Sequence, residues 1–252
     1  GKIRAFTRTH ENHSTIPVDG NGYLDAESIP ADSLLTLQMV NGETGIIQDH
    51  EVLKTRAELV VLDATYSGPR IELGDDWDGA IFASQAWGGP PGISLMAIAN
   101  TKQWRYPLPH IAPIRTPGGY SLPLLLGAAV ALENFQEDQE KVSSLNKYLR
   151  QKIATALPSA IVVGANSKTL SHLQTIVIPG TISEMLVREL EAHTISIDAG
   201  SACSPSDLAP SHVLAAMGLP SEGSLRLTLR QEHTEADIDA LVKALVEVCR
   251  DF

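Results

Sequence analysis

The chain has 252 residues, 43% of them hydrophobic, and a formal net charge of −11 at pH 7. This length and composition can build a normal globular core in one large or two small domains. The acidic balance, with no basic run, argues against nucleic acid or an anionic membrane as the main partner. The sequence has neither an apolar stretch of about 18 residues nor a signal-peptide pattern, which predicts no membrane span and a cytoplasmic location.

The first half of the chain is predicted to be an α/β domain. Several of its strands are apolar on both faces, a pattern typical of a parallel sheet that helices cover. An apolar run at residues 14–18 ends in the turn Asp-Gly-Asn-Gly. Strands are expected at residues 2–9, 34–40, 58–64, 79–84 and 93–99, and a short helix at 47–55.

The second half is predicted to be a smaller α+β domain. It begins in a helical region, with an apolar helix at residues 122–135 and an amphipathic helix that ends at 157. Thr234 is expected to cap the closing helix, because Asp237 follows three residues later. Further strands are expected at 160–163, 174–178, 194–197 and 224–229, and further helices at 183–193 and 211–217.

A loop of small residues at 197–206 carries Cys203. Gly200 and its neighbours allow unusual backbone angles, while Pro205 restricts the loop, so this segment can move a thiol. The residues alone leave a second interpretation open, in which Cys203 is an ordinary small apolar side chain. With only two cysteines, Cys203 and Cys249, no disulfide framework is expected. We also predict no metal site.

The C-terminal part resembles the cysteine desulfurases, which belong to the class V aminotransferase family of pyridoxal-phosphate (PLP) enzymes. The resemblance rests on Gly-Ser-Ala-Cys at 200–203, Pro-Ser-His-Val-Leu at 210–214 and Ser-Leu-Arg-Leu-Thr-Leu at 224–229. In that family, the loop cysteine takes sulfur from the substrate cysteine as a persulfide, and the arginine holds the substrate carboxylate. The resemblance therefore assigns these roles to Cys203 and Arg226.

The resemblance also implies the type I PLP-transferase fold, which is similar to that of aspartate aminotransferase. It divides the chain into residues 1–134, part of a large α/β domain with a mainly parallel sheet, and 135–252, a small α+β domain with the cysteine loop. In the family the large domain carries PLP. We expect the N-terminal part of the family fold, with its phosphate-binding loop, to be missing before Gly1.

Two positions of the large domain bear on the cofactor. Asp63 follows a predicted strand and matches the family's aspartate, which pairs with the pyridinium nitrogen of PLP. Without the resemblance, a solvated aspartate at a strand end is the alternative. Ala86 stands where the family has the lysine that binds PLP covalently. Because alanine has no amine, we expect that PLP is not bound covalently.

The remaining cofactor-side positions also depart from the family pattern. His10 matches the histidine that stacks on the PLP ring, with His13 as a competing candidate, and Arg115 matches an arginine near the neighbouring subunit's phosphate. Four family side chains are replaced, so the resemblance implies a vestigial cofactor site. The replacements are Gly42 for asparagine, Tyr66 for glutamine, Ala83 for serine and Gln85 for histidine.

The favoured hypothesis is a cysteine-desulfurase-like protein that has lost PLP-dependent activity. It keeps Cys203 as a persulfide acceptor, or binds a small ligand or a partner. One alternative is an active cysteine desulfurase or PLP lyase, with the lysine replaced by engineering or its role moved. Another is the structural half of a heteromeric desulfurase. The expected partners are a second copy in a homodimer, a partner desulfurase or a sulfur-transfer protein, with no nucleic acid and no membrane.

Overall fold

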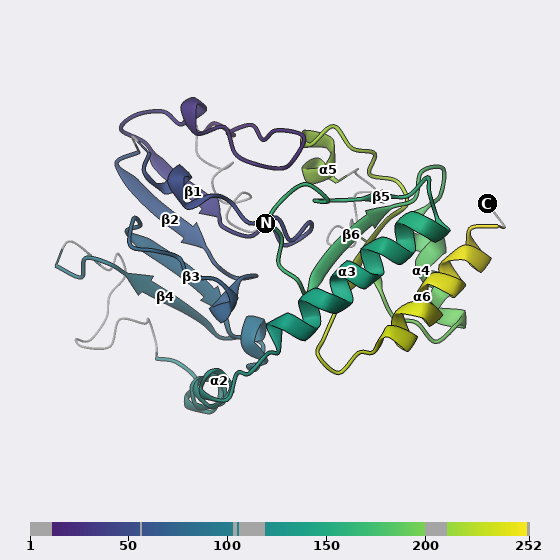
Figure 1. Ribbon diagram of the computed structural model, residues 1–252. Coiled ribbons are helices and arrows are strands. Elements are labelled where there is room, and N and C mark those ends of the chain that lie inside the picture. The colour runs from purple at the N-terminus through teal and green to yellow at the C-terminus, as the bar shows by residue number, and fades with distance from the viewer. Residues whose placement is uncertain (1–11, 56, 103–104, 106–118, 200–210, 251–252) are drawn as a thin grey trace. The chain divides into compact units, whose positions relative to one another are not determined.

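The computed structural model describes residues 12–55, 57–102, 105, 119–199 and 211–250, and it divides into two compact units (Figure 1). Unit 1 comprises Gly1–Ile16, Ala26–Val40 and Gln48–Gln136. Unit 2 comprises Pro17–Asp25, Asn41–Ile47 and Glu137–Phe252. Unit 2 therefore takes two short segments from the first part of the chain, which nothing in the sequence indicates.

Unit 1 contains a four-stranded sheet in the order β1-β2-β3-β4. The first three strands are parallel, as the apolar runs predict, and β4 pairs with β3 antiparallel. Residues 84–93, which include η4, separate β3 from β4 and are fewer than the dozen or more that the crossover of a parallel pair requires. The strands are β1 (Leu34–Gln38), β2 (Leu59–Asp63), β3 (Gly79–Ala83) and β4 (Ser94–Ile98).

The helices of unit 1 are mostly single turns. The helix expected at 47–55 is only η2 (His50–Leu53), a 3-10 turn in which the Asp49 side chain accepts from the N–H of Glu51. A longer helix among the described residues is α2 (Leu122–Glu133), and Trp87 Nε1 donates to Ala128 O at 3.0 Å, which ties α2 to the turn after β3. The other turns are η1 (Ala26–Ser28), η3 (Gly68–Arg70) and η4 (Ser84–Trp87).

Two expectations near the N-terminus have different outcomes. The strand expected at 2–9 lies outside the described residues. The apolar run at 14–18 contributes only an isolated bridge between Val18 and Leu24. Among the described residues, no helix combines the length and apolar character needed to cross a membrane.

Unit 2 contains an antiparallel sheet in the order β5-β6-β8-β7, with three helices on one face. The core of this layer joins Leu149 of α3, Ile176 of β6, Leu186 of α4, Leu225 of β8 and Leu245 of α6, all fully buried. The elements are α3 (Gln139–Ala156), β5 (Ile161–Val162), β6 (Leu173–Val177), α4 (Ser183–Ala192), β7 (Asp198–Ala199), β8 (Ser224–Thr228) and α6 (Glu235–Val248).

The other face of this sheet is covered by α5 (His212–Ala216) and by residues 41–47. Val177 of β6 packs there in one cluster with Ile46, Leu214 and Met217. Because successive strand residues point to opposite faces, this cluster and the three-helix core use alternate positions of the same strands.

The strand predicted at 194–197 is wrong. Residues 193 and 194 form a turn after α4, in which Thr194 has a φ of 61° and its N–H donates to Glu191 O at 2.9 Å. The strand is instead β7, where Asp198 pairs with Arg226 of β8. The apolar residues of 194–197 therefore lead into the sheet edge, and two Ile side chains there, Ile195 and Ile197, pack on the core.

The start of α6 confirms the predicted cap. Thr234 Oγ1 accepts from the N–H of Asp237 at 3.3 Å, and Asp237 Oδ2 accepts from the N–H of Thr234 at 2.8 Å. Replacing Thr234 with Ala removes this capping box and is expected to lower the free energy of unfolding by about 1 kcal/mol in urea denaturation. Thr155→Ala is the control, because its hydroxyl only back-bonds to Gln151 O within α3, so its loss leaves stability nearly unchanged or slightly raised.

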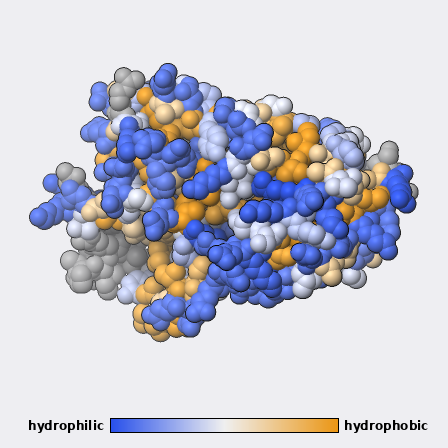
Figure 2. All heavy atoms as spheres, viewed as in Figure 1, coloured by the Kyte–Doolittle hydropathy of each residue, from blue (hydrophilic) through white to orange (hydrophobic). Residues whose placement is uncertain are grey.

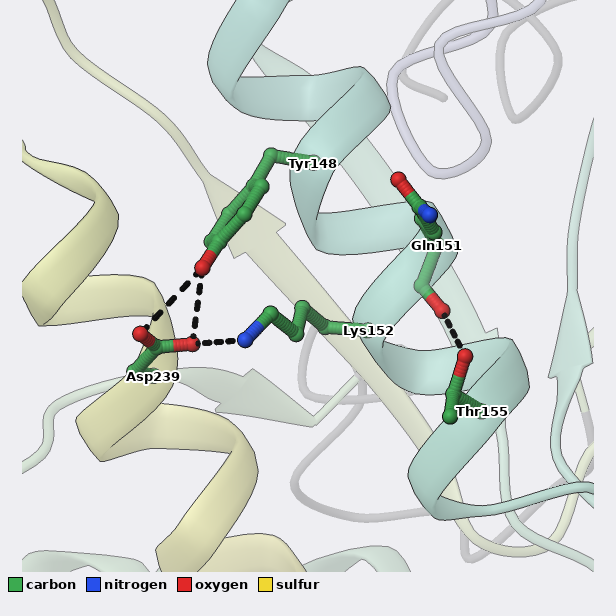
Figure 3. A network of polar contacts seen from close by, with 5 residues as sticks. All are labelled: Tyr148, Gln151, Lys152, Thr155 and Asp239. Carbon is green, nitrogen blue, oxygen red and sulfur yellow. Dashed lines mark hydrogen bonds and ion pairs between the residues drawn. The ribbon is translucent and has the colours of Figure 1, made fainter.

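A polar cluster joins α3 to α6 on the surface of unit 2 (Figure 3). Tyr148 and Lys152 of α3 both reach Asp239 of α6, with Lys152 Nζ 2.7 Å from Asp239 Oδ1 and the Tyr148 hydroxyl 3.1 Å away. The shared hydrogen bonds lower the pKa of Asp239 and raise that of Lys152. All three side chains are accessible to water, so this ion pair adds little stability.

Candidate functional site

Arg226, to which the resemblance assigns carboxylate binding, lies on the sheet face of unit 2 that α5 covers. It occupies the middle of β8, in register with Thr175 of β6 on one side and with Asp198 of β7 on the other. Register partners point to the same face of a sheet, so these three side chains stand in one row across three strands. The strand pairing therefore fixes both neighbours of the guanidinium.

The contacts of Arg226 within unit 2 include a carboxylate and a carbonyl. Its Nη2 lies 2.7 Å from Asp198 Oδ2, and its Nη1 donates to Gly42 O at 3.4 Å. The Arg226 side chain is only 19% exposed, whereas that of Asp198 is 60% exposed. The guanidinium is thus held from inside the fold, with a counter-ion that reaches it from the solvent side.

A second acid, Glu43, lies near this guanidinium. Its backbone carbonyl accepts from Thr175 Oγ1 at 2.5 Å, which places residue 43 next to the row of strand side chains. Burial raises the pKa of the Glu43 carboxyl, and a hydrogen bond from Ser211 and the charge of Arg226 oppose that rise. Ser211 is also the N-cap of α5, accepting from the N–H of Leu214. The cluster therefore combines one guanidinium with two carboxyl groups.

In unit 1, Asp63 lies at the carboxyl end of β2. It is 8% exposed, and its Oδ1 accepts from both the N–H and the hydroxyl of Thr65, at 3.0 and 2.6 Å. Ligands of open α/β sheets bind at this end of the strands. The placement of Asp63 suits a carboxylate that faces a ring nitrogen.

Ala86 lies in η4, the turn that follows β3 in the same unit. Arg70 Nη1 donates to Ala86 O at 2.5 Å, and a Cβ built on Gly68 would stand 2.8 Å from Ala86 Cβ. The turn at position 86 is therefore packed closely against η3, with a methyl group at the position where the resemblance predicts the lysine. The residues present do not fit a covalently bound PLP at this position, since no nucleophilic nitrogen stands there.

Of the sequence-predicted site residues, the structure describes Asp63, Ala86 and Arg226. His10, Arg115 and Cys203 lie outside the described residues. The structure adds two acids that the sequence did not indicate, Asp198 and Glu43. Asp198 could not be found from the sequence, because its pairing with Arg226 depends on the register of two strands that lie 28 residues apart.

Comparisons with known proteins agree with this architecture. The family model described as Aminotransferase class-V matches residues 116–241, half of the chain. The chain belongs to the class-V aminotransferase family. This class-V chain is 27% identical to a cysteine desulfurase of Trichormus azollae over 92% of its own length. It is 28% identical to the cysteine desulfurase IscS of Clostridium botulinum over 93% of its length.

The class-V chain spans 64% of the length of the Trichormus relative and 65% of the Clostridium one. Among solved structures, a NifS-like protein from Rickettsia africae superposes with a TM-score of 0.82 at 23% identity, covering 98% of this chain and 72% of that one. An apo cysteine desulfurase from Thermococcus onnurineus gives a TM-score of 0.75 at 17% identity, with 95% and 66% covered. The type I PLP-transferase fold expected from the sequence is thereby confirmed.

Proposed function

We propose that this chain is a cysteine-desulfurase-like protein without covalent PLP chemistry, which accepts sulfur on Cys203 and binds the carboxylate of a small ligand through Arg226. The observation that carries the proposal is Ala86 at the position of the family's lysine. The side chain there ends at Cβ and packs against η3, so the covalent link to the cofactor has no attachment point.

The amino-acid replacements around this position also support the loss of covalent PLP chemistry. Gln85 and Ala83 stand beside Ala86 where the resemblance places a histidine and a phosphate-binding serine, and Tyr66, 40% exposed, stands where it places a glutamine. A single replaced lysine fits an engineered variant of an active enzyme. Several coordinated replacements favour loss of the PLP reaction in the protein itself.

The proposed sulfur transfer needs no cofactor on this chain. The Cys203 thiolate attacks the outer sulfur of a persulfide on a donor protein, so a new S–S bond forms at Cys203 as the donor's S–S bond breaks. The donor leaves as a thiolate, and no external oxidant or reductant is consumed. A partner desulfurase is the proposed donor, because that class of enzyme makes protein persulfides.

Mass spectrometry tests this function directly. The purified chain, incubated with PLP and L-cysteine, is expected to release no sulfide. The same chain, incubated with a persulfidated cysteine desulfurase, is expected to gain one sulfur atom at Cys203. Cys249 is the internal control, because burial raises the pKa of its thiol and leaves less reactive thiolate. Sulfide release with PLP, or sulfur on Cys249 alone, would contradict the proposal.

Assembly with another chain, as a homodimer or with a partner desulfurase, is part of the same proposal. Figure 2 shows hydrophobic residues gathered over α2, where Leu122, Leu126 and Val130 are 59%, 62% and 56% exposed. Exposed apolar side chains in such number on one helix are typical of a surface that another protein covers. Light scattering is expected to give a mass above that of one chain, alone or after mixing with the donor.

A further inference from the structure

The carboxylate-binding arginine of unit 2 already holds a carboxylate from its own chain. Asp198 Oδ2 lies 2.7 Å from Arg226 Nη2, the distance of a charge-assisted hydrogen bond. The two residues are direct register partners in β7 and β8, so the backbone pairing itself brings them together. A ligand carboxylate that approaches Nη2 of Arg226 therefore competes with Asp198.

A ligand carboxylate can displace the Asp198 carboxylate from Arg226. The Asp198 side chain is 60% exposed, so it can turn into water without leaving a buried charge unpaired. Arg226 is only 19% exposed and is also held by Gly42 O, so the guanidinium stays in place while its counter-ion is exchanged. The structure thus provides a fixed cation with a displaceable internal anion.

The carboxylate of Asp198 beside Arg226 makes a purely anionic ligand unfavourable. Glu43 also lies near this guanidinium; burial raises the pKa of its carboxyl, and the Ser211 hydrogen bond and the charges of Arg226 and of the N-terminal amine lower it. A ligand that carries only a carboxylate adds a further negative charge to this cluster. A ligand that carries an ammonium group beside its carboxylate adds no net charge, and its ammonium group can donate to the exposed Asp198.

We infer that Asp198 is a specificity-determining residue of this site, which competes with ligand carboxylates for Arg226 and selects against ligands whose only charge is a carboxylate. The inference rests on the proposed function, in which Arg226 takes the ligand's carboxylate. In this inference Asp198 determines the affinity of the site for ligands and which charged groups a ligand must carry.

A matched pair of ligands tests the inference. L-cysteine and 3-mercaptopropionate share a thiol and a carboxylate and differ in the ammonium group. Binding to the purified chain is measured by calorimetry, without PLP and with a phosphine reductant. The unaltered chain is expected to prefer L-cysteine. Asp198→Asn is expected to strengthen 3-mercaptopropionate binding about five-fold, the factor typical of one partly exposed charge interaction, and to change L-cysteine binding much less.

Three further variants separate the possible outcomes. Asp239→Asn removes the same charge from the ion pair between α3 and α6 and is expected to leave both affinities unchanged. Asp198→Ser repeats the test with a smaller side chain, in case the amide alters the fold. Arg226→Gln is expected to abolish binding of both ligands.

Unchanged 3-mercaptopropionate binding in both Asp198 variants, with binding lost in Arg226→Gln, overturns the inference and leaves the role of Arg226 intact. Binding that survives Arg226→Gln, or that is absent from every variant, overturns the proposed role of Arg226 and the inference together.

Discussion

Replacing Ala86 with lysine is expected to create a chain that binds PLP covalently at position 86 and still releases no sulfide from L-cysteine. The new amine would start from a defined backbone, because Ala86 O accepts from Arg70 Nη1 and the turn is packed against Gly68. Position 86 is half-buried, so a long side chain can extend from it. Turnover needs more than the amine, and the residues that the family uses around it are still replaced.

Borohydride reduction followed by peptide mapping measures the first part of this prediction. Ala86→Lys should carry a reduced PLP adduct on the peptide that contains residue 86, and the unaltered chain should carry none there. Gln85→Lys is the matched control, since residue 85 is exposed and its lysine should react no more than other surface lysines.

Sulfide assays measure the second part. Steady sulfide release by Ala86→Lys with L-cysteine and PLP would show that the lysine alone was missing. That result would replace the proposed loss of PLP chemistry with the alternative of an active desulfurase whose lysine was substituted.

Much of the fold is predictable from the sequence because strong local patterns agree with it. The apolar run at 34–40 forms β1, and the stripe of Val142, Leu145 and Leu149 packs as the buried face of α3. The capping box at Thr234 forms as its spacing predicts. In each case the pattern that predicts the element also buries it, so local preference and tertiary packing act together.

The mispredicted parts depend on contacts between distant residues. At 194–197 the apolar pattern favours a strand, yet Thr194 closes a turn after α4 and the pairing begins only at Asp198. Residues 41–47 belong to unit 2 because Ile46 packs with Val177 and Met217, residues far along the chain. The pairing of Asp198 with Arg226 cannot be predicted from the sequence for the same reason: no sequence pattern encodes which residues of two strands face each other.

Gly223→Ala is expected to produce a large loss of stability in unit 2. Gly223 has a φ of +70°, and a Cβ built on it would overlap the carbonyl oxygen of Ile178 and the hydroxyl of Thr181. The backbone cannot move away easily, because the N–H of Ile178 donates to Gly223 O at 3.0 Å and so joins the end of β6 to the start of β8. The overlap and the unfavourable φ together should lower the free energy of unfolding by about 3 kcal/mol or more.

Gly218→Ala separates the two causes. Gly218 has nearly the same φ, +72°, but a Cβ built on it meets nothing within 4 Å. Its replacement should therefore cost only the backbone term, about 1 kcal/mol. Urea denaturation followed by circular dichroism compares the two variants. Equal losses would mean that the turn between α5 and β8 relaxes to admit a methyl group. A clearly larger loss in Gly223→Ala would identify the close approach of Gly223 to Ile178 and Thr181, in the loop after β6, as the feature that requires glycine. Because β8 carries Arg226, the same variant should also weaken carboxylate binding in proportion to the unfolded fraction, and not beyond it.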